Sequence, residues 1–98
     1  MSVTIDSVLV RDKDLDATDL NGHVVVLNVP AGAYFGFNGV ASEIWHFLSE
    51  PRRVGEIFNE LSQNHEVDAA TLSRDVLPFL QSLIDRRLAV QIDPDGLR

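Results

Sequence analysis

Cysteine is absent from this sequence of 98 residues, and several other signatures are missing with it. A chain without cysteine has no disulfide, no thiolate metal site and no cysteine nucleophile. Its apolar runs fall short of the roughly 20 residues that a membrane helix requires. The first ten residues lack the basic start and apolar block of a signal peptide. These absences favour a soluble, cytoplasmic protein.

Basic residues are also scarce. Eight lysines and arginines stand against 15 acidic residues, which gives a formal net charge of −7. Nucleic acids and anionic membranes are bound largely through lysine and arginine, so we expect neither as a partner. With 45% hydrophobic residues the composition is globular. The length fits a single domain, residues 1–98, around one hydrophobic core.

Catalytic and metal-binding motifs are lacking as well. His23, His46 and His65 are scattered, and none has a second ligand at metal-binding spacing. No serine lies in a Gly-x-Ser-x-Gly turn, and no glycine-rich loop could hold a phosphate. The acidic run Asp12–Asp16 resembles the start of a calcium loop, but its sixth and twelfth positions are alanine and histidine instead of glycine and glutamate. We therefore expect no catalytic residue, no metal, no cofactor and no enzymatic activity of this chain alone.

The first third of the chain carries strand patterns. Val3–Arg11 and His23–Val29 are rich in β-branched residues, and Ala33–Phe37 is a short aromatic run. Asn21-Gly22 before the second run, and Pro-Ala-Gly after it, supply turn residues. We predict that these three runs form a three-stranded antiparallel sheet and that residues 12–22 are a polar connection.

The remaining two thirds carry helical patterns. Apolar residues recur at helical spacing over Gly39–Ser49, Arg53–Gln63 and Ala69–Arg87. Asp68 is well suited to cap the last of these helices. Residues 88–92 fit either a short terminal strand or an extended tail. The predicted fold class is α+β, with a three-stranded antiparallel sheet followed by three helices.

The aromatic strand is the best candidate for a binding surface. Alternate side chains point to opposite faces, so Phe35 and Phe37 face inward while Tyr34 and Gly36 face outward. At a sheet edge, the unpaired N–H and C=O groups of this strand could accept a strand from a peptide; alternatively, Gly36 marks a bulge and the edge is covered. The third helix has an apolar arc of about 160°, wider than the usual ~100°. That helix is either buried on several sides or lines a groove.

The ordered set of residues along the chain resembles PqqD-like proteins. The motifs that carry the resemblance are Phe35-x-Phe37-Asn38, Ile44-Trp45, Val67-Asp68 and Asp75-Val76-x-x-Phe79-Leu80. The resemblance as a whole covers roughly residues 5–92, and the ordered set of motifs is specific although no single motif is. The family is that of recognition elements for ribosomally synthesised precursor peptides, whose members are small winged helix-turn-helix-like domains. They bind the leader segment of a precursor peptide and present it to modifying enzymes.

The resemblance implies a peptide site between the third strand and the third helix, where family members accept the leader as an added strand. Carried over to this sequence, the strand side is Ala33, Tyr34, Phe35, Gly36 and Phe37, and the helix side is Leu72, Asp75, Val76, Phe79 and Leu83. Asp75 would pair with a basic leader residue or stay solvated. The two phenylalanines of the strand could equally belong to the core.

The segment after the first helix indicates the branch of the family. Members that partner a radical SAM enzyme in pyrroloquinoline quinone synthesis tend to carry Cys-Asp-Gly there. This chain has Leu-Ser-Glu-Pro-Arg at residues 48–52, which is more like stand-alone domains of lasso peptide clusters. The resemblance thus implies non-catalytic leader binding, with a leader peptidase and an asparagine-synthetase-like cyclase as partners.

Three other functions are compatible with the sequence. The chain could be a PqqD-type peptide chaperone for a radical SAM enzyme, a winged-helix transcriptional regulator, or a subunit that only stabilises an enzyme. The leader sequence and the oligomeric state are left open.

Overall fold

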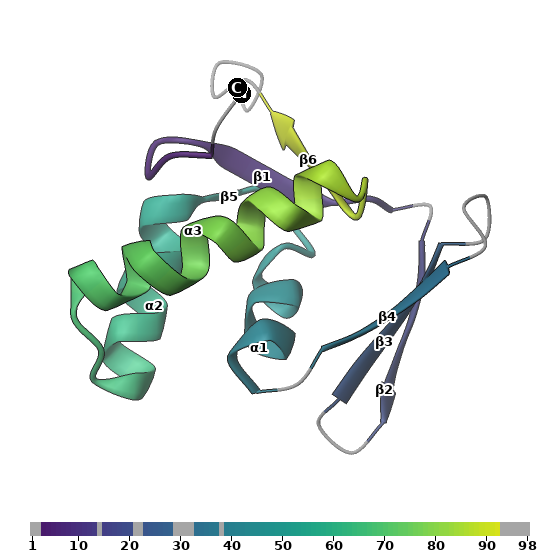
Figure 1. Cartoon of the computed structure of the whole chain (residues 1–98), viewed down its shortest axis with the longest axis horizontal. Coiled ribbons are helices and arrows are strands. Elements are labelled where there is room, and N and C mark those ends of the chain that lie inside the picture. Colours follow the sequence, from purple (N-terminus) through teal and green to yellow (C-terminus); the bar gives the residue numbers. More distant parts are fainter. Residues whose placement is uncertain (1–2, 14, 21–22, 29–32, 38, 93–98) are drawn as a thin grey trace.

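The computed structural model of the chain describes residues 3–13, 15–20, 23–28, 33–37 and 39–92. Its elements in chain order are β1 (Val8–Arg11), β2 (Asp16–Leu20), β3 (His23–Asn28), β4 (Ala33–Phe37), α1 (Gly39–Phe47), β5 (Arg52–Arg53), α2 (Val54–His65), α3 (Ala69–Asp85) and β6 (Ala89–Ile92). Most strands precede the helices (Figure 1), so the α+β prediction is confirmed. The Asn21-Gly22 and Pro-Ala-Gly turns lie outside the described residues.

Strands β2, β3 and β4 form an antiparallel sheet that we call the wing sheet, with β3 in the middle. Figure 1 shows it projecting from the helices, with β2 and β4 as its edges. Val24 and Val26 of β3 are buried and anchor the sheet to the body of the protein. The pairing of β4 with β3 continues without interruption from Phe37 to Ala33, so over these five residues Gly36 marks no bulge.

The predicted partners of the first strand are wrong. β1 pairs with β5 on one side and β6 on the other, and these three strands form a second antiparallel sheet. The third strand of the wing sheet is instead β2, within the segment expected to be a polar connection. Its two aspartates give it little intrinsic strand preference, but β2 pairs with β3 along its whole length, from Asp16 with Leu27 to Leu20 with His23. Residues 89–92 form a terminal strand, one of the two alternatives predicted.

The three helices lie where the apolar periodicity places them, with bounds that differ by no more than two residues. Asp68 caps α3, since its carboxylate accepts a hydrogen bond from the backbone N–H of Thr71 at 2.8 Å. α2 ends at Glu66, whose left-handed φ of 52° turns the chain towards α3. These local signals set the positions of the helices before any tertiary contact is considered.

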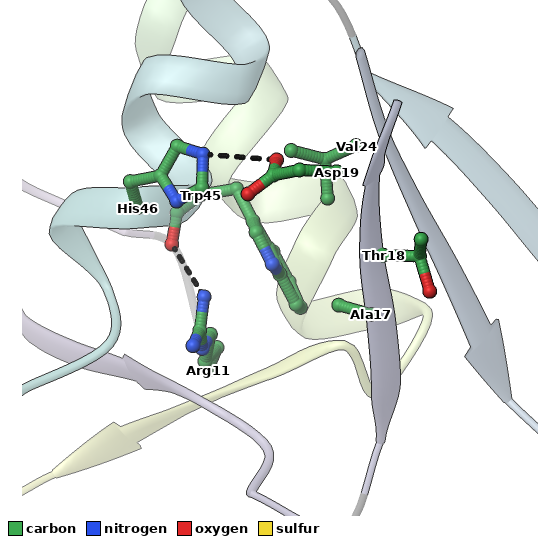
Figure 2. A pocket seen from close by; sticks show the side chains of 7 residues that line it. All are labelled: Arg11, Ala17, Thr18, Asp19, Val24, Trp45 and His46. Carbon is green, nitrogen blue, oxygen red and sulfur yellow. Dashed lines mark hydrogen bonds and ion pairs between the residues drawn. The ribbon is translucent and has the colours of Figure 1, made fainter. Parts of the chain in front are cut away.

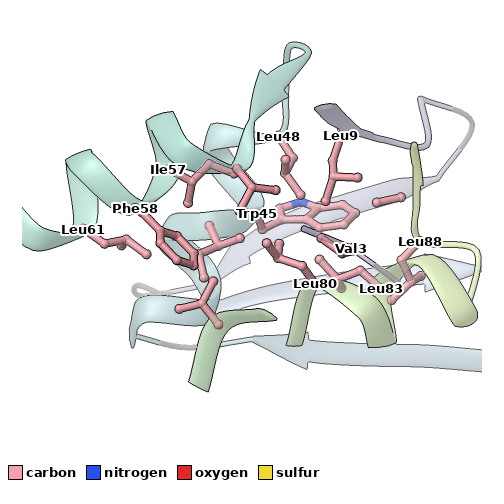
Figure 3. Close-up of a cluster of buried hydrophobic side chains, with 14 of the residues drawn as sticks. Val3, Leu9, Trp45, Leu48, Ile57, Phe58, Leu61, Leu80, Leu83 and Leu88 are labelled. Atoms are coloured by element: carbon pink, nitrogen blue, oxygen red, sulfur yellow. The ribbon is translucent and has the colours of Figure 1, made fainter. Parts of the chain in front are cut away.

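The hydrophobic core lies between the helices, the sheet of β5, β1 and β6, and strand β3, with Trp45 of α1 near its centre (Figure 3). Trp45 is 1% exposed, and Leu48 and Leu80 lie on its two sides. The buried residues of α3 are Leu72, Val76, Leu80 and Leu83. Most of the wide apolar arc of α3 is therefore buried, and only its margin is available to line a groove.

Candidate peptide-binding groove

β4 is an edge strand, because within the described part of the chain it pairs with β3 alone. Leu20 and His23 form the last pair of the β2–β3 ladder and are separated by two residues along the chain, and such a pair exchanges both main-chain hydrogen bonds. In an antiparallel ladder these bonded pairs alternate. Counting from this last pair, the main-chain groups of Phe35 point towards β3, and those of Tyr34 and Gly36 point to the open edge. Two residues of β4 thus offer N–H and C=O groups that no described strand pairs with.

The side chains of β4 alternate as predicted. Phe37 is half-buried, stacks on Trp45 with ring centroids 5.7 Å apart, and meets Phe79 of α3 edge to face at 5.6 Å. On the opposite face Tyr34 is exposed, and no atom lies within 4 Å of the position that a Cβ would take at Gly36. One face of β4 therefore packs towards α3 while the other faces solvent.

Arg86, directly after α3, makes a second contact with β4. Its guanidinium carbon lies 5.4 Å from the centroid of the Phe35 ring, a cation–π arrangement. Because Phe35 meets Arg86 and Phe37 meets Phe79, β4 runs from the end of α3 back towards its middle. We use the word groove for the open edge of β4 together with the residues that border it, Phe79 of α3 and Arg86 directly after α3.

Past Phe37 the groove leads to an apolar pocket between α1 and α3. The pocket has a volume of about 250 Å³, and its lining residues are Val40, Ala41, Ile44, Asp75, Val76 and Phe79. Asp75 is the charged group of this lining, and a hydrogen bond from Arg74 lowers the pKa of its carboxyl, which is ionised at neutral pH. The pocket therefore suits an apolar side chain with a cation close by.

The structure brings together only part of the predicted site. Ala33–Phe37 forms the open edge, and Phe79 and Asp75 border the groove and the pocket. Val76 is 5% exposed and belongs mainly to the core, although it reaches the pocket. Leu72 and Leu83 are buried in the core and do not line the pocket. The helix side of the site is thus narrower than the resemblance implies.

Sequence reasoning missed four residues that border this region, of which Ile44 lines the pocket from the buried face of α1. Val40 and Ala41 line the pocket from the first turn of α1, and Arg86 lies over Phe35. Val40 is 40% exposed although the helical pattern assigns it to the apolar face. Its position directly after the aromatic strand was the available signal, because the first turn of the next helix must lie near the end of β4.

A second hollow lies on the other side of α1, beside β2 (Figure 2). It has a volume of about 170 Å³, and of its polar side chains Arg11, Asp19 and His46 already interact with one another or with backbone. Arg11 donates to the carbonyl of Trp45 at 3.5 Å, and His46 lies 3.3 Å from Asp19. The exception is the indole N–H of Trp45, which is buried and has no partner within the described residues. Since four of its seven lining residues are polar or charged (Arg11, Thr18, Asp19 and His46), this hollow fits an apolar side chain less well than the pocket does.

Metal-binding clusters and membrane-spanning helices are both missing from the described part of the chain. Within those residues, no three histidine or acidic side chains are grouped so as to hold a metal ion. Asp14 of the acidic run lies outside the described residues, so that run is not tested in full. Among the described helices, none has the length and apolar character needed to cross a membrane.

Comparison with known proteins links the chain to a family. The family described as coenzyme PQQ synthesis protein D (PqqD) matches residues 23–89. The solved structure of TbiB1 in complex with the TbiA(beta) leader peptide is similar, with a TM-score of 0.75 and 31% sequence identity. That similarity covers 82% of this chain and 93% of the other. The comparison with curated proteins finds no match. The family match runs from β3 to the first residue of β6, and so includes β4, α1 and α3.

Proposed function

This chain belongs to the PqqD family, and from that membership we propose that it is a recognition element that binds the leader segment of a ribosomally synthesised precursor peptide. The similarity to TbiB1, which was solved with a leader peptide, supports leader binding here. The same similarity, together with the absence of Cys-Asp-Gly at residues 48–52, favours lasso peptide biosynthesis. In this proposal the chain catalyses nothing and presents the bound leader to a leader peptidase and an asparagine-synthetase-like cyclase.

The observation that carries the proposal is the difference between the two edges of the wing sheet. β4 has the sequence AYFGF and no charged residue, whereas β2 contains Asp16 and Asp19. Asp19 pairs with Val24 and so lies on the inward face of the sheet. Charged residues on an edge strand, above all inward-pointing ones, oppose the addition of another strand. A peptide strand can therefore add to β4 and is disfavoured at β2.

The groove offers two sources of affinity to such a peptide. The outward main-chain groups of Tyr34 and Gly36 can form hydrogen bonds with it, each worth about 0.5–1.5 kcal/mol net. A leucine-sized side chain that fills the apolar pocket adds roughly 1.5–3 kcal/mol. The main chain thus supplies affinity for any extended segment, and the pocket supplies specificity. Bound beside its enzymes, the precursor reaches them at a raised effective concentration.

Fluorescence polarisation tests the proposal, with a labelled leader peptide taken from the precursor gene next to the gene of this chain. Wild type is compared with Phe79→Ala and Val40→Asp, which alter the pocket at half-buried and exposed positions. Val76 is a poor target, because an aspartate at a position only 5% exposed would disrupt the core. The matched control is Val90→Asp, since Val90 is 47% exposed on β6 and does not line the pocket.

We expect saturable binding by wild type and by Val90→Asp, and binding weakened about tenfold or more by either pocket variant. Circular dichroism establishes that every variant is folded. Absence of binding by folded wild type would reject the proposal. In that case, tight association with an enzyme would instead identify the chain as a stabilising subunit.

A further inference from the structure

We infer that the groove also reads charge: it selects a leader segment with a basic residue near its N-terminal end and an acidic residue about five positions later. The inference rests on the proposed leader binding, and it adds the chemistry and the direction of the bound segment. It is drawn from the unlike charges at the two ends of the groove.

The end of the groove at the pocket is acidic. Asp75 borders the pocket, and its only described ion pair is with the adjacent Arg74, at 3.0 Å. The side chains of this pair are 60% and 74% exposed, and so exposed a pair is weak. Asp75 and Asp68, which caps the same helix, together give two negative charges against the single positive charge of Arg74. A leader cation beside the pocket therefore meets a net negative charge.

The opposite end of the groove is basic. Arg86 lies over the Phe35 ring and is exposed, and Arg87 follows it. The nearby acid Asp85 accepts a hydrogen bond from the side-chain amide of Gln81 at 3.0 Å, so it is engaged on α3 itself. Because Arg86 contacts Phe35 of β4, its guanidinium group is the charge that an added strand would meet at this end of the groove. A leader carboxylate placed over Phe35 would be within reach of Arg86.

The distance between the two ends sets the spacing of the charges. Asp75 and Arg86 are 11 positions apart along α3, which at 1.5 Å per residue is about 16 Å. An extended peptide advances about 3.4 Å per residue, so this distance corresponds to about five residues. Between the two charges, alternate side chains would face α3 and the pocket, and these we expect to be apolar.

The direction of the bound segment follows from the direction of β4. β4 starts near Arg86 and ends near Phe79, on the side of the pocket. Both sheets of this protein are antiparallel, and antiparallel pairing is the slightly more stable arrangement. An antiparallel leader therefore enters at the pocket with its N-terminal part. The basic residue consequently precedes the acidic one in the leader sequence.

A display experiment with random peptides tests this inference independently of any single leader sequence. A library of random peptides about 12 residues long is selected by mRNA display against the immobilised full chain, and enriched sequences are aligned. Parallel selections use Asp75→Lys and Arg86→Glu, both of which are exposed positions. The matched control is Glu60→Lys, an exposed charge reversal on α2 outside the groove.

With wild type and Glu60→Lys, we expect enriched peptides to carry Lys or Arg followed about five positions later by Asp or Glu. Asp75→Lys should reverse the preference only at the basic position of the peptide, and Arg86→Glu should reverse it only at the acidic position. Reversing the matching charge in one enriched peptide should weaken its binding roughly two- to fivefold, the range of exposed ion pairs. The corresponding protein variant should restore the binding.

The outcomes separate this inference from the proposed function. Enriched peptides without the charge pattern, or with a pattern that neither protein variant changes, would overturn the charge inference and leave leader binding intact. Failure of folded wild type to enrich any peptide would overturn leader binding and the charge inference with it. Arg86→Gln, which removes the charge without reversing it, should abolish the acidic preference and leave the apolar one.

Discussion

Replacing Gly36 by proline tests strand addition at a single atom. The outward N–H of Gly36 is one of the donors that β4 presents to an added strand, and proline has no N–H. Proline is tolerated on an edge strand where its nitrogen faces away from the sheet, so the pairing of β4 with β3 should survive. The matched control is Gly36→Ala, because a Cβ at this position meets no atom within 4 Å.

The loss expected from Gly36→Pro is that of one main-chain hydrogen bond, about 0.5–1.5 kcal/mol, or roughly two- to twelvefold in the dissociation constant. Steric interference between the proline ring and the approaching strand would add to this loss. Gly36→Ala should bind like wild type. Isothermal titration calorimetry with the leader peptide measures the affinities, and thermal melting monitors the fold.

Two results would count against the reasoning. If Gly36→Pro binds the leader as tightly as Gly36→Ala, a main-chain bond at residue 36 contributes nothing, and strand addition at that point is wrong. If Gly36→Pro instead melts far below Gly36→Ala, the N–H of Gly36 is bonded to β3. The alternation deduced from the Leu20–His23 pair would then be shifted by one residue.

Three further predictions concern the fold. Leu80→Ala removes a fully buried side chain beside Trp45 and should lower the free energy of unfolding by about 2–5 kcal/mol in urea titrations; a loss below about 1 kcal/mol would contradict the packing described. The hydrogen bond from His65 at 2.6 Å lowers the pKa of Glu43 below its ordinary 4.5. The stabilisation that the ionised Glu43 gives the fold is therefore present above pH 4.5 and is lost as the pH falls through the lowered pKa. Glu43→Gln should therefore be less stable than wild type near pH 6, by no more than about 1 kcal/mol, with a difference that shrinks as the pH falls below 4.5; a constant difference would reject the assignment. Asp68→Ala should lower the melting temperature because the N–H of Thr71 loses its cap, whereas Asp68→Asn should retain most of it.

The helices could be predicted from the sequence because their signals are local. Apolar spacing located all three, and the capping residue Asp68 marked the start of α3. β2 was missed because Asp16 and Asp19 suppress the strand pattern. The Asn21-Gly22 signal predicted a tight turn, and a tight turn directly before β3 implies a strand on its other side. The pairing of β1 with β5 and β6 joins distant parts of the chain, and no local pattern encodes it.

The strand side of the candidate site could be located from the sequence, whereas its helix side could be located only in part. Alternation placed Phe37 and Tyr34 on the correct faces of β4. An apolar arc of α3, however, does not distinguish residues that face a groove from residues that face other helices. Leu72 and Leu83 were therefore assigned to the groove although they are buried in the core. That distinction depends on how α1 and α2 pack against α3, which is set by tertiary contacts.

The unequal edges of the wing sheet also determine how copies of this chain could associate. Two chains that meet through β4 use the same surface on each, so the contact closes as a twofold dimer. A contact of β4 with β2 of the next chain would repeat from head to tail and grow into a filament, and Asp16 and Asp19 oppose that growth. Self-association in the absence of peptide should therefore stop at two copies. Because the leader would use the same main-chain groups of Tyr34 and Gly36, it would return such a dimer to monomers.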